Sequence, residues 1–273
     1  MQSCLLAAKA QGFDQIIRDD IMRLAALQAP SPAGDLNLAM TQLDWALRAA
    51  GAAGAVMLTA PEVFLPGYNQ DGIAALAQTR DGAWAQSLAR LCSAAGCGVT
   101  LGYAERDGDH VFNAAISFDA KGERLAHYRK IQLYGAREAA LYRPGDAYEI
   151  FDLNGHKAAL LICYDVEFAP HIAALAARGV TVILVPTANM YPFDHVVRYT
   201  VPAMAAAYGV SIVYANYAGH EGDLHYVGGS LIAGRDGAVL AQAGAGTALL
   251  IADLPDLGAA TLSSQALDLR VIG

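Results

Sequence analysis

The order of apolar segments is the feature that most limits how this chain can fold. Short apolar runs typical of buried strands occur at residues 23–28, 55–59 and 98–104. Between them lie segments whose apolar residues recur at helical spacing, such as residues 36–50 and 83–95. Strands that alternate with helices in this way predict a layered α/β domain.

Two turn-rich segments, at residues 119–122 and 235–237, each separate a pair of apolar runs and predict β-hairpins. Hairpins add antiparallel strands to a sheet whose other strands are joined by helical crossovers, so we expect mixed sheets. No Pro- or Ser-rich linker and no break in composition divides the chain. We therefore expect residues 22–273 to form a single domain, preceded by an N-terminal extension over residues 1–21.

Composition excludes several classes of protein. The formal net charge is -8, whereas a nucleic-acid surface needs clustered Lys and Arg. The 4 cysteines form no CxxC pair and no zinc-type cluster with histidine, so neither a disulfide scaffold nor a metal site is expected. A reducing cytoplasm suits such a chain best.

One uncharged stretch, residues 199–219, is long enough to span a bilayer. It contains Pro202, Gly209 and Asn216, however, and its pattern changes from helical to strand-like midway. We interpret it as a buried helix followed by a buried strand, and we expect no membrane span.

Three residues capable of chemistry follow predicted strands. Cys163 comes after the apolar run 158–162, Glu62 after 55–59, and Lys130 at the end of a hairpin strand. The carboxyl end of a sheet is where α/β proteins build sites, and a helix beginning just after Cys163 would lower the pKa of its thiol. Taken singly, each has a simpler interpretation: a core cysteine, a helix or turn cap, and a surface lysine. Together they supply a nucleophile, a general base and an oxyanion-stabilising cation.

The surrounding sequence resembles the nitrilase superfamily of carbon–nitrogen hydrolases. The similar segments are Pro-Glu-Val-Phe at 61–64, Tyr-Arg-Lys at 128–130 and Ile-Cys-Tyr-Asp-Val-Glu-Phe at 162–168. The resemblance implies a four-layer α-β-β-α sandwich, a Glu62–Lys130–Cys163 triad, and Glu138 as a second glutamate that positions substrate. It also implies a thioester intermediate, no metal or organic cofactor, and a homodimer or larger homo-oligomer.

Neighbouring residues favour the amidase branch. Tyr164 follows the cysteine where nitrilases usually carry Trp, and the arginine with which carbamoylases hold a carboxylate is missing. Further segments are similar to bacterial ω-amino-amide and short-chain aliphatic amidases, which implies a small primary amide as substrate. Tyr68, Asn189 and Met190 are then expected in the pocket, with the backbone N–H of Tyr164 as an oxyanion donor.

Several alternatives stay open at this stage. A nitrile or an N-carbamoyl compound could be hydrolysed by the same three residues. An amine on the substrate could pair with any of four acidic residues: Glu167, Asp194, Glu221 or Asp223. The chain departs from the usual family pattern at Gln132 and at Ala169, Pro170 and Pro202, and the last three suggest a third hypothesis, a catalytically silent binding or assembly protein.

Overall fold

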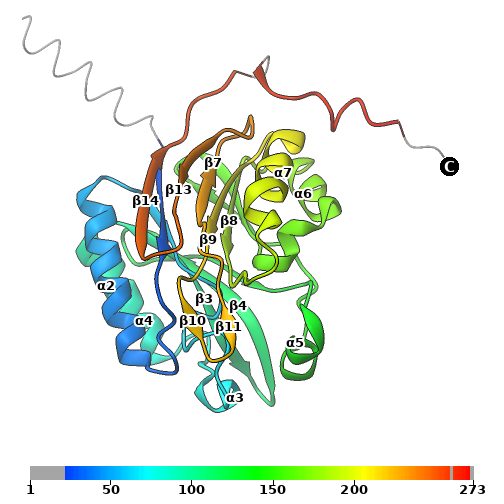
Figure 1. Ribbon diagram of the computed structural model, residues 1–273. Coiled ribbons are helices and arrows are strands. Elements are labelled where there is room, and N and C mark those ends of the chain that lie inside the picture. The colour runs from blue at the N-terminus through cyan, green and yellow to red at the C-terminus, as the bar shows by residue number, and fades with distance from the viewer. Residues whose placement is uncertain (1–21, 259–260, 271–273) are drawn as a thin grey trace, which may run out of the picture.

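The computed structural model describes residues 22–258 and 261–270. The extension predicted at residues 1–21 lies outside this part of the chain, as does Cys4. Two six-stranded sheets form the centre of the molecule (Figure 1). From edge to edge the first sheet comprises β14 (Ala248–Asp253), β1 (Arg23–Gln28), β2 (Met57–Thr59), β3 (Gly98–Asp107), β4 (His110–Phe118) and β5 (Arg124–Arg129). The second comprises β13 (Val239–Gln242), β12 (Leu231–Ala233), β9 (Ser211–Ala215), β8 (Val182–Pro186), β7 (His156–Leu160) and β6 (Ile150–Leu153).

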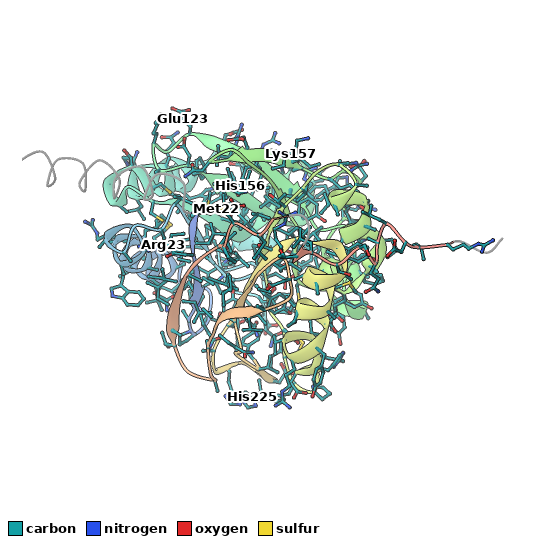
Figure 2. The ribbon with its side chains drawn as sticks, turned by 90° about the horizontal axis from the view of Figure 1, so that it is seen from above. Met22, Arg23, Glu123, His156, Lys157 and His225 are labelled. Carbon is teal, nitrogen blue, oxygen red and sulfur yellow. The ribbon has the colours of Figure 1, made fainter. Side chains whose placement is uncertain are left out.

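Helices cover the outer face of each sheet. The first sheet packs against α2 (Leu36–Ala52) and α4 (Ala83–Ala95), and the second against α6 (Ala169–Ala176) and α7 (Val201–Tyr208) (Figure 1). Strands β1 and β9, and β3 and β8, contact one another across the middle. Seen from above, helices lie on both sides of the paired sheets (Figure 2). The predicted four-layer α-β-β-α sandwich is confirmed.

Both sheets are mixed, as the hairpins indicated. Strands β1, β2 and β3 are parallel in the first sheet, and β7, β8 and β9 are parallel in the second. Antiparallel strands flank each set of three. Met22 immediately precedes β1, and His156 is the first residue of β7. Both line one cavity, which therefore lies at the amino-terminal end of these strands (Figure 2). The carboxyl ends of the parallel strands therefore meet at the opposite end of the sandwich.

Local sequence explains where the helices begin and end. The carboxylate of Asp35 accepts hydrogen bonds from the N–H groups of Asn37 and Leu38, at 2.9 and 3.0 Å, and so caps α2. Helix α4 ends at Gly96, which adopts the left-handed conformation that favours glycine. Both helices were predicted from the sequence.

The uncharged stretch also folds as a helix and then a strand. A π-helical turn (Val196–Thr200) leads into α7, and β9 follows. Pro202 is the second residue of α7 and follows the π-helical turn without a break in the helical backbone. Within the described residues, no helix is both long and apolar enough to cross a bilayer.

The segment before Cys163 differs from the prediction. Strand β7 ends at Leu160 instead of Ile162, because the Ile162 N–H donates to the carboxylate of Asp165, at 3.0 Å, and leaves the sheet ladder. A 3-10 turn (Cys163–Glu167) comes next, and α6 begins only at Ala169. Pro170 falls in the first turn of α6, so this departure from the family pattern leaves the helix intact.

Shorter elements complete the chain and were not expected from the sequence. They are β6, α3 (Ile73–Leu76), α5 (Gly135–Leu141), and the small hairpin of β10 (His220–Glu221) and β11 (Leu224–His225). Of these, α5 matters most for the site, because it carries Glu138.

Candidate active site

The ends of three strands bring the predicted chemical residues together. Lys130 directly follows β5. Two residues separate Glu62 from the end of β2, and two separate Cys163 from the end of β7. The Glu62 N–H donates to the carbonyl of Thr187, just after β8, at 3.2 Å, and so ties the first sheet to the second. The site therefore lies between the two sheets at the carboxyl ends of their parallel strands.

Lys130 is the centre of a buried ionic cluster. Its Nζ donates to Glu62 Oε1 at 2.6 Å and to Glu138 Oε1 at 2.9 Å, and all three side chains are at most 1% exposed. The Tyr68 hydroxyl donates to Glu138 Oε1 at 2.7 Å, and the Tyr134 N–H donates to Glu138 Oε2 at 2.9 Å. The interpretation of Lys130 as a surface lysine is wrong, and Glu138 is one of the residues that contact it.

Glu62 retains one unused acceptor. Asn113 Nδ2 donates to Oε1 of Glu62 at 2.7 Å, the same oxygen that Lys130 contacts. Oε2 of Glu62 is buried and has no hydrogen-bond partner among the described residues. Burial raises the pKa of the Glu62 carboxyl to about 7, although the charge of Lys130 opposes the increase. A carboxylate with a free oxygen and a pKa near neutrality is suited to general-base work.

Cys163 stands in an unusual backbone conformation. Its φ of 45° lies in the left-handed region that non-glycine residues rarely adopt, and such strain often accompanies functional sites. Burial and the nearby charge of Glu62 raise the pKa of the thiol well above its ordinary value, against the effect of Lys130. The lowered thiol pKa expected from a following helix is therefore wrong: the residue begins a 3-10 turn and is buried near the charge of Glu62.

Asp165 fixes the turn that presents Cys163. Its buried carboxylate accepts hydrogen bonds from the Tyr128 hydroxyl at 2.8 Å, the Gln132 N–H at 2.7 Å and the Ile162 N–H at 3.0 Å. These bonds link the nucleophile turn to the segment that carries Lys130. The sequence analysis missed this role, and the only signal was an acidic residue two positions after the cysteine.

Gly102 allows the Glu62 segment to lie against β3. A Cβ at this position would come within 2.5 Å of the Pro61 carbonyl oxygen and 2.6 Å of Glu62 Cα. Any larger residue must therefore displace the backbone that carries the glutamate.

A cavity of about 220 Å³ opens beside Cys163. It is small compared with the roughly 300–1,000 Å³ typical of ligand sites. Its lining consists of Tyr68, Tyr134, Cys163, Tyr164, Glu167, Ala188, Asn189, Met190, Phe193 and His195. All four predicted pocket residues are in this set, and Tyr134, Phe193 and His195 are additions that the sequence analysis missed.

Aromatic rings form one wall of the cavity. The ring of Tyr134 makes edge contacts with Tyr164 and Phe193, with centroids 5.3 and 5.8 Å apart. Phe193 also accepts a hydrogen bond at its carbonyl from Asn189, at 3.1 Å. The wall is thus apolar and comes mostly from the second half of the chain.

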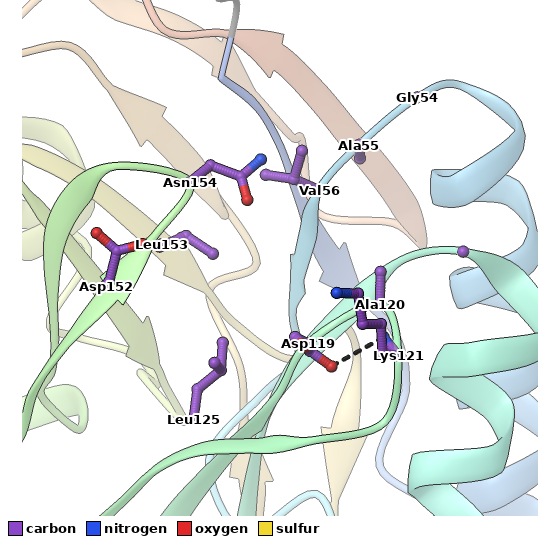
Figure 3. Close-up of a pocket in the computed structure, with 11 residues that line it drawn as sticks. Gly54, Ala55, Val56, Asp119, Ala120, Lys121, Leu125, Asp152, Leu153 and Asn154 are labelled. Carbon is purple, nitrogen blue, oxygen red and sulfur yellow. Dashed lines mark hydrogen bonds between the residues drawn. The ribbon is translucent and has the colours of Figure 1, made fainter. Parts of the chain in front are cut away.

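A larger cavity, of about 380 Å³, lies elsewhere and is a poorer candidate (Figure 3). It is lined by turns near the amino-terminal ends of the strands, including Val56, Asp119 and Leu153. Asp119 there accepts a hydrogen bond from the N–H of Lys121 within its own turn. The larger cavity contains neither a cysteine nor the ionic cluster.

The described residues offer no obvious metal centre. Within residues 22–258 and 261–270, no three His, Cys, Asp or Glu side chains are grouped so that they could hold a metal ion. Cys92 and Cys97 are buried and free, with thiol pKa values raised by burial to about 12, so they lack the thiolate character of a ligand or nucleophile.

Comparison with known proteins identifies the family. Residues 23–261 match the carbon–nitrogen hydrolase model, so the chain belongs to this family, the nitrilase superfamily. It is 40% identical over 237 residues to a protein of Pseudomonas protegens named "hydrolase in pqqF 5′ region", covering 85% of this chain and 82% of that one. It is 32% identical over 190 residues to an (R)-stereoselective amidase of Pseudomonas sp., covering 69% of each chain.

A solved structure agrees with the fold over nearly its whole length. A double mutant of the amidase from Nesterenkonia sp. AN1, in complex with acrylamide, superposes with a TM-score of 0.83 at 32% identity, covering 92% of this chain and 94% of that one. Other structures of that amidase hold butyramide, or the acetamide moiety of fluoroacetamide bound covalently to the active-site cysteine.

Proposed function

We propose that this carbon–nitrogen hydrolase cleaves small primary amides to a carboxylic acid and ammonia, through a thioester on Cys163. One observation carries the proposal: Glu62 keeps a free buried oxygen, is held by Lys130, and lies near enough to Cys163, which lines a small cavity, for its charge to raise the pKa of the thiol. The amides bound by the Nesterenkonia amidase support this choice of substrate.

The first half of the reaction uses the raised pKa of the thiol. Because the proton stays on Cys163 in the resting enzyme, attack requires Glu62 to remove it. Sγ then bonds to the amide carbon, and the carbonyl oxygen becomes an oxyanion that Lys130 Nζ and the Tyr164 N–H stabilise. Glu62 returns the proton to the amide nitrogen, the carbon–nitrogen bond breaks and ammonia leaves.

In the second half of the reaction, water is the nucleophile and the thiolate of Cys163 is the leaving group. A water molecule enters where ammonia left, and Glu62 takes one of its protons as the oxygen attacks the thioester carbon. The carbon–sulfur bond breaks, Sγ regains a proton from Glu62, and the acid departs. No step calls for a metal or an organic cofactor.

Glu138 acts as a positioning residue in this scheme. It accepts a hydrogen bond from Lys130 Nζ, and Tyr68 and the Tyr134 N–H donate to Glu138. The size of the cavity restricts the acyl group to a short chain.

Ammonia release tests the proposal directly. We expect acetamide, propionamide and butyramide to be hydrolysed, with much slower release from the corresponding nitriles and from an N-carbamoyl amino acid. Activity confined to the nitrile or the carbamoyl compound would overturn the amidase assignment. Mass spectrometry of quenched reactions should show an acyl group on Cys163 in the wild type and none in Cys163→Ala.

A further inference from the structure

One acidic side chain lines the candidate cavity without a partner. Glu167 ends the 3-10 turn that Cys163 begins, and it borders the same cavity. Among the described residues, its carboxylate forms no side-chain hydrogen bond and no ion pair within 4.0 Å. The proposed hydrolysis does not use it, so its place in the cavity requires another explanation.

The other acidic residues near this end of the molecule are already engaged. Asp194 pairs with Arg198 at 3.1 Å. Glu221 accepts from the Tyr226 hydroxyl at 2.5 Å, and Asp223 accepts from Asn69 at 2.8 Å. None of the three borders the cavity. Of the four carboxylates that the sequence left open, only Glu167 borders the cavity.

The path from Cys163 to Glu167 suits a short alkyl chain. A 3-10 turn rises about 2.0 Å per residue, so the two Cα atoms lie roughly 8 Å apart along its axis. The rings of Tyr134, Tyr164 and Phe193 border the intervening space. Such rings pack against methylene groups, and their faces attract a cation. His195 also lines this cavity, and a charge on its imidazole opposes the burial that raises the pKa of the Glu167 carboxyl.

We propose that Glu167 is a specificity residue that binds the ammonium end of an ω-amino amide while Cys163 attacks the amide at the other end. The inference rests on the proposed amide hydrolysis. It predicts that amides with a terminal ammonium are preferred over neutral amides of equal length, and that amides with a terminal carboxylate are excluded.

A matched pair of substrates tests the preference. 5-Aminopentanamide and hexanamide have the same number of heavy atoms and differ in a terminal ammonium against a terminal methyl. We expect kcat/KM of the wild type at about pH 8, where the amine is protonated, to favour 5-aminopentanamide by about tenfold or more. In Glu167→Gln this ratio should fall by about tenfold.

Asp194→Asn is the control, because Asp194 is a nearby acidic residue that pairs with Arg198 outside the cavity. It should leave the ratio as in the wild type. An equal decrease for both substrates in Glu167→Gln, or an unchanged ratio, would overturn the inference. A decrease of the same size in Asp194→Asn would show that general surface charge sets the preference.

Binding without turnover separates this inference from the proposed function. In Cys163→Ala, calorimetry should show tighter binding of 5-aminopentanamide than of hexanamide, and adding Glu167→Gln should remove the difference. If the wild type hydrolyses hexanamide but shows no preference in either assay, only the role of Glu167 fails. If it releases ammonia from no amide at all, the proposed function fails, and the inference fails with it.

Discussion

The two halves of the sandwich contribute to the site in different ways. The first half supplies Glu62, Asn113, Lys130 and Glu138, whose side chains are fully buried and joined by hydrogen bonds of 2.6–2.9 Å. The second half supplies Cys163 and most of the cavity wall, where side chains are partly exposed and have few polar partners. The difference is notable because the parallel strands of both sheets are arranged alike.

This difference suggests a division of labour. A buried ionic cluster holds its geometry because each charge depends on the others for the solvation it has lost. A wall of apolar side chains with few hydrogen-bond partners can be substituted without leaving a buried charge unpaired. We therefore expect substitutions of the charged residues in this cluster to abolish chemistry or folding, and substitutions in the second-half wall to alter substrate choice.

The largest effect is expected from Glu62→Gln. The amide cannot take the thiol proton, while the shape of the side chain and its contacts with Lys130 and Asn113 are largely kept. We expect kcat/KM for butyramide to fall by about 10³-fold or more. Steady-state ammonia release is the measurement.

Glu105→Gln is the matched control for this change. Glu105 is also buried and ion-paired, with Arg129 at 2.7 Å, but it lies outside the site. Its variant should lose stability while the folded protein keeps its activity. A Glu62→Gln enzyme within tenfold of the wild type would show that another group removes the proton.

Lys130→Met tests whether the cluster holds the first half together. The change leaves Glu62 and Glu138 facing each other without a cation, so we expect about 3–5 kcal/mol less free energy of unfolding at pH 8. The loss should shrink as the pH falls, because protonation removes the uncompensated negative charge of these carboxyls. Urea denaturation at two pH values measures both effects.

The exposed Lys157 provides the comparison for this variant. Lys157→Met removes the same charge from the surface and should change the free energy of unfolding by no more than about 0.5 kcal/mol. Equal effects of the two substitutions would contradict the central place of Lys130.

Much of this arrangement could be predicted from the sequence, because local patterns determine it. The apolar runs that precede Glu62 and Cys163, and the hairpin that ends at Lys130, each lie within a few neighbouring residues. The family resemblance then brought the strand ends together. The single domain, the homo-oligomer and the cytoplasmic location stay predictions.

Partners from distant parts of the chain could not be predicted. Asn113 lies 51 residues from Glu62, and Phe193 faces the cavity from a loop with no regular pattern. The predicted direction of the thiol pKa shift was wrong for the same reason. The pKa of Cys163 depends on burial and on the charge of Glu62, and Glu62 comes close to Cys163 only when the two sheets pack together. Short elements such as α5 have too few residues to show a periodicity.

Asn113→Leu should produce a smaller effect, visible in the pH profile. Hydrolysis requires ionised Glu62, so kcat/KM of the wild type should fall as the pH drops through about 7. The Asn113 hydrogen bond lowers the pKa of the Glu62 carboxyl. Loss of this bond should therefore move the acid limb of the kcat/KM profile to higher pH by about half a unit to one unit. Asn113 Oδ1 is itself buried without a partner among the described residues, which limits the cost of an apolar replacement.

Ser117→Ala, on the same strand, is the control for the pH profile. Its hydroxyl pairs with Thr100 at 2.7 Å and not with the ionic cluster. Its acid limb should coincide with that of the wild type. An unshifted limb in Asn113→Leu would mean that the carboxyl titrating in kcat/KM is not Glu62.

The smallest effect on catalysis is expected in the second-half wall, from Phe193→Ala. Removing the ring that contacts Tyr134 enlarges the cavity and leaves every charge paired as before. We expect the ratio of kcat/KM for hexanamide over acetamide to rise severalfold, since one methylene in an apolar pocket is worth about 10–200-fold at most. Tyr199→Ala, a change of an aromatic side chain that is 69% exposed, should leave the ratio unchanged. A loss of 100-fold or more on acetamide in Phe193→Ala would show that this wall also sets the catalytic geometry, and the division between the two halves would no longer hold.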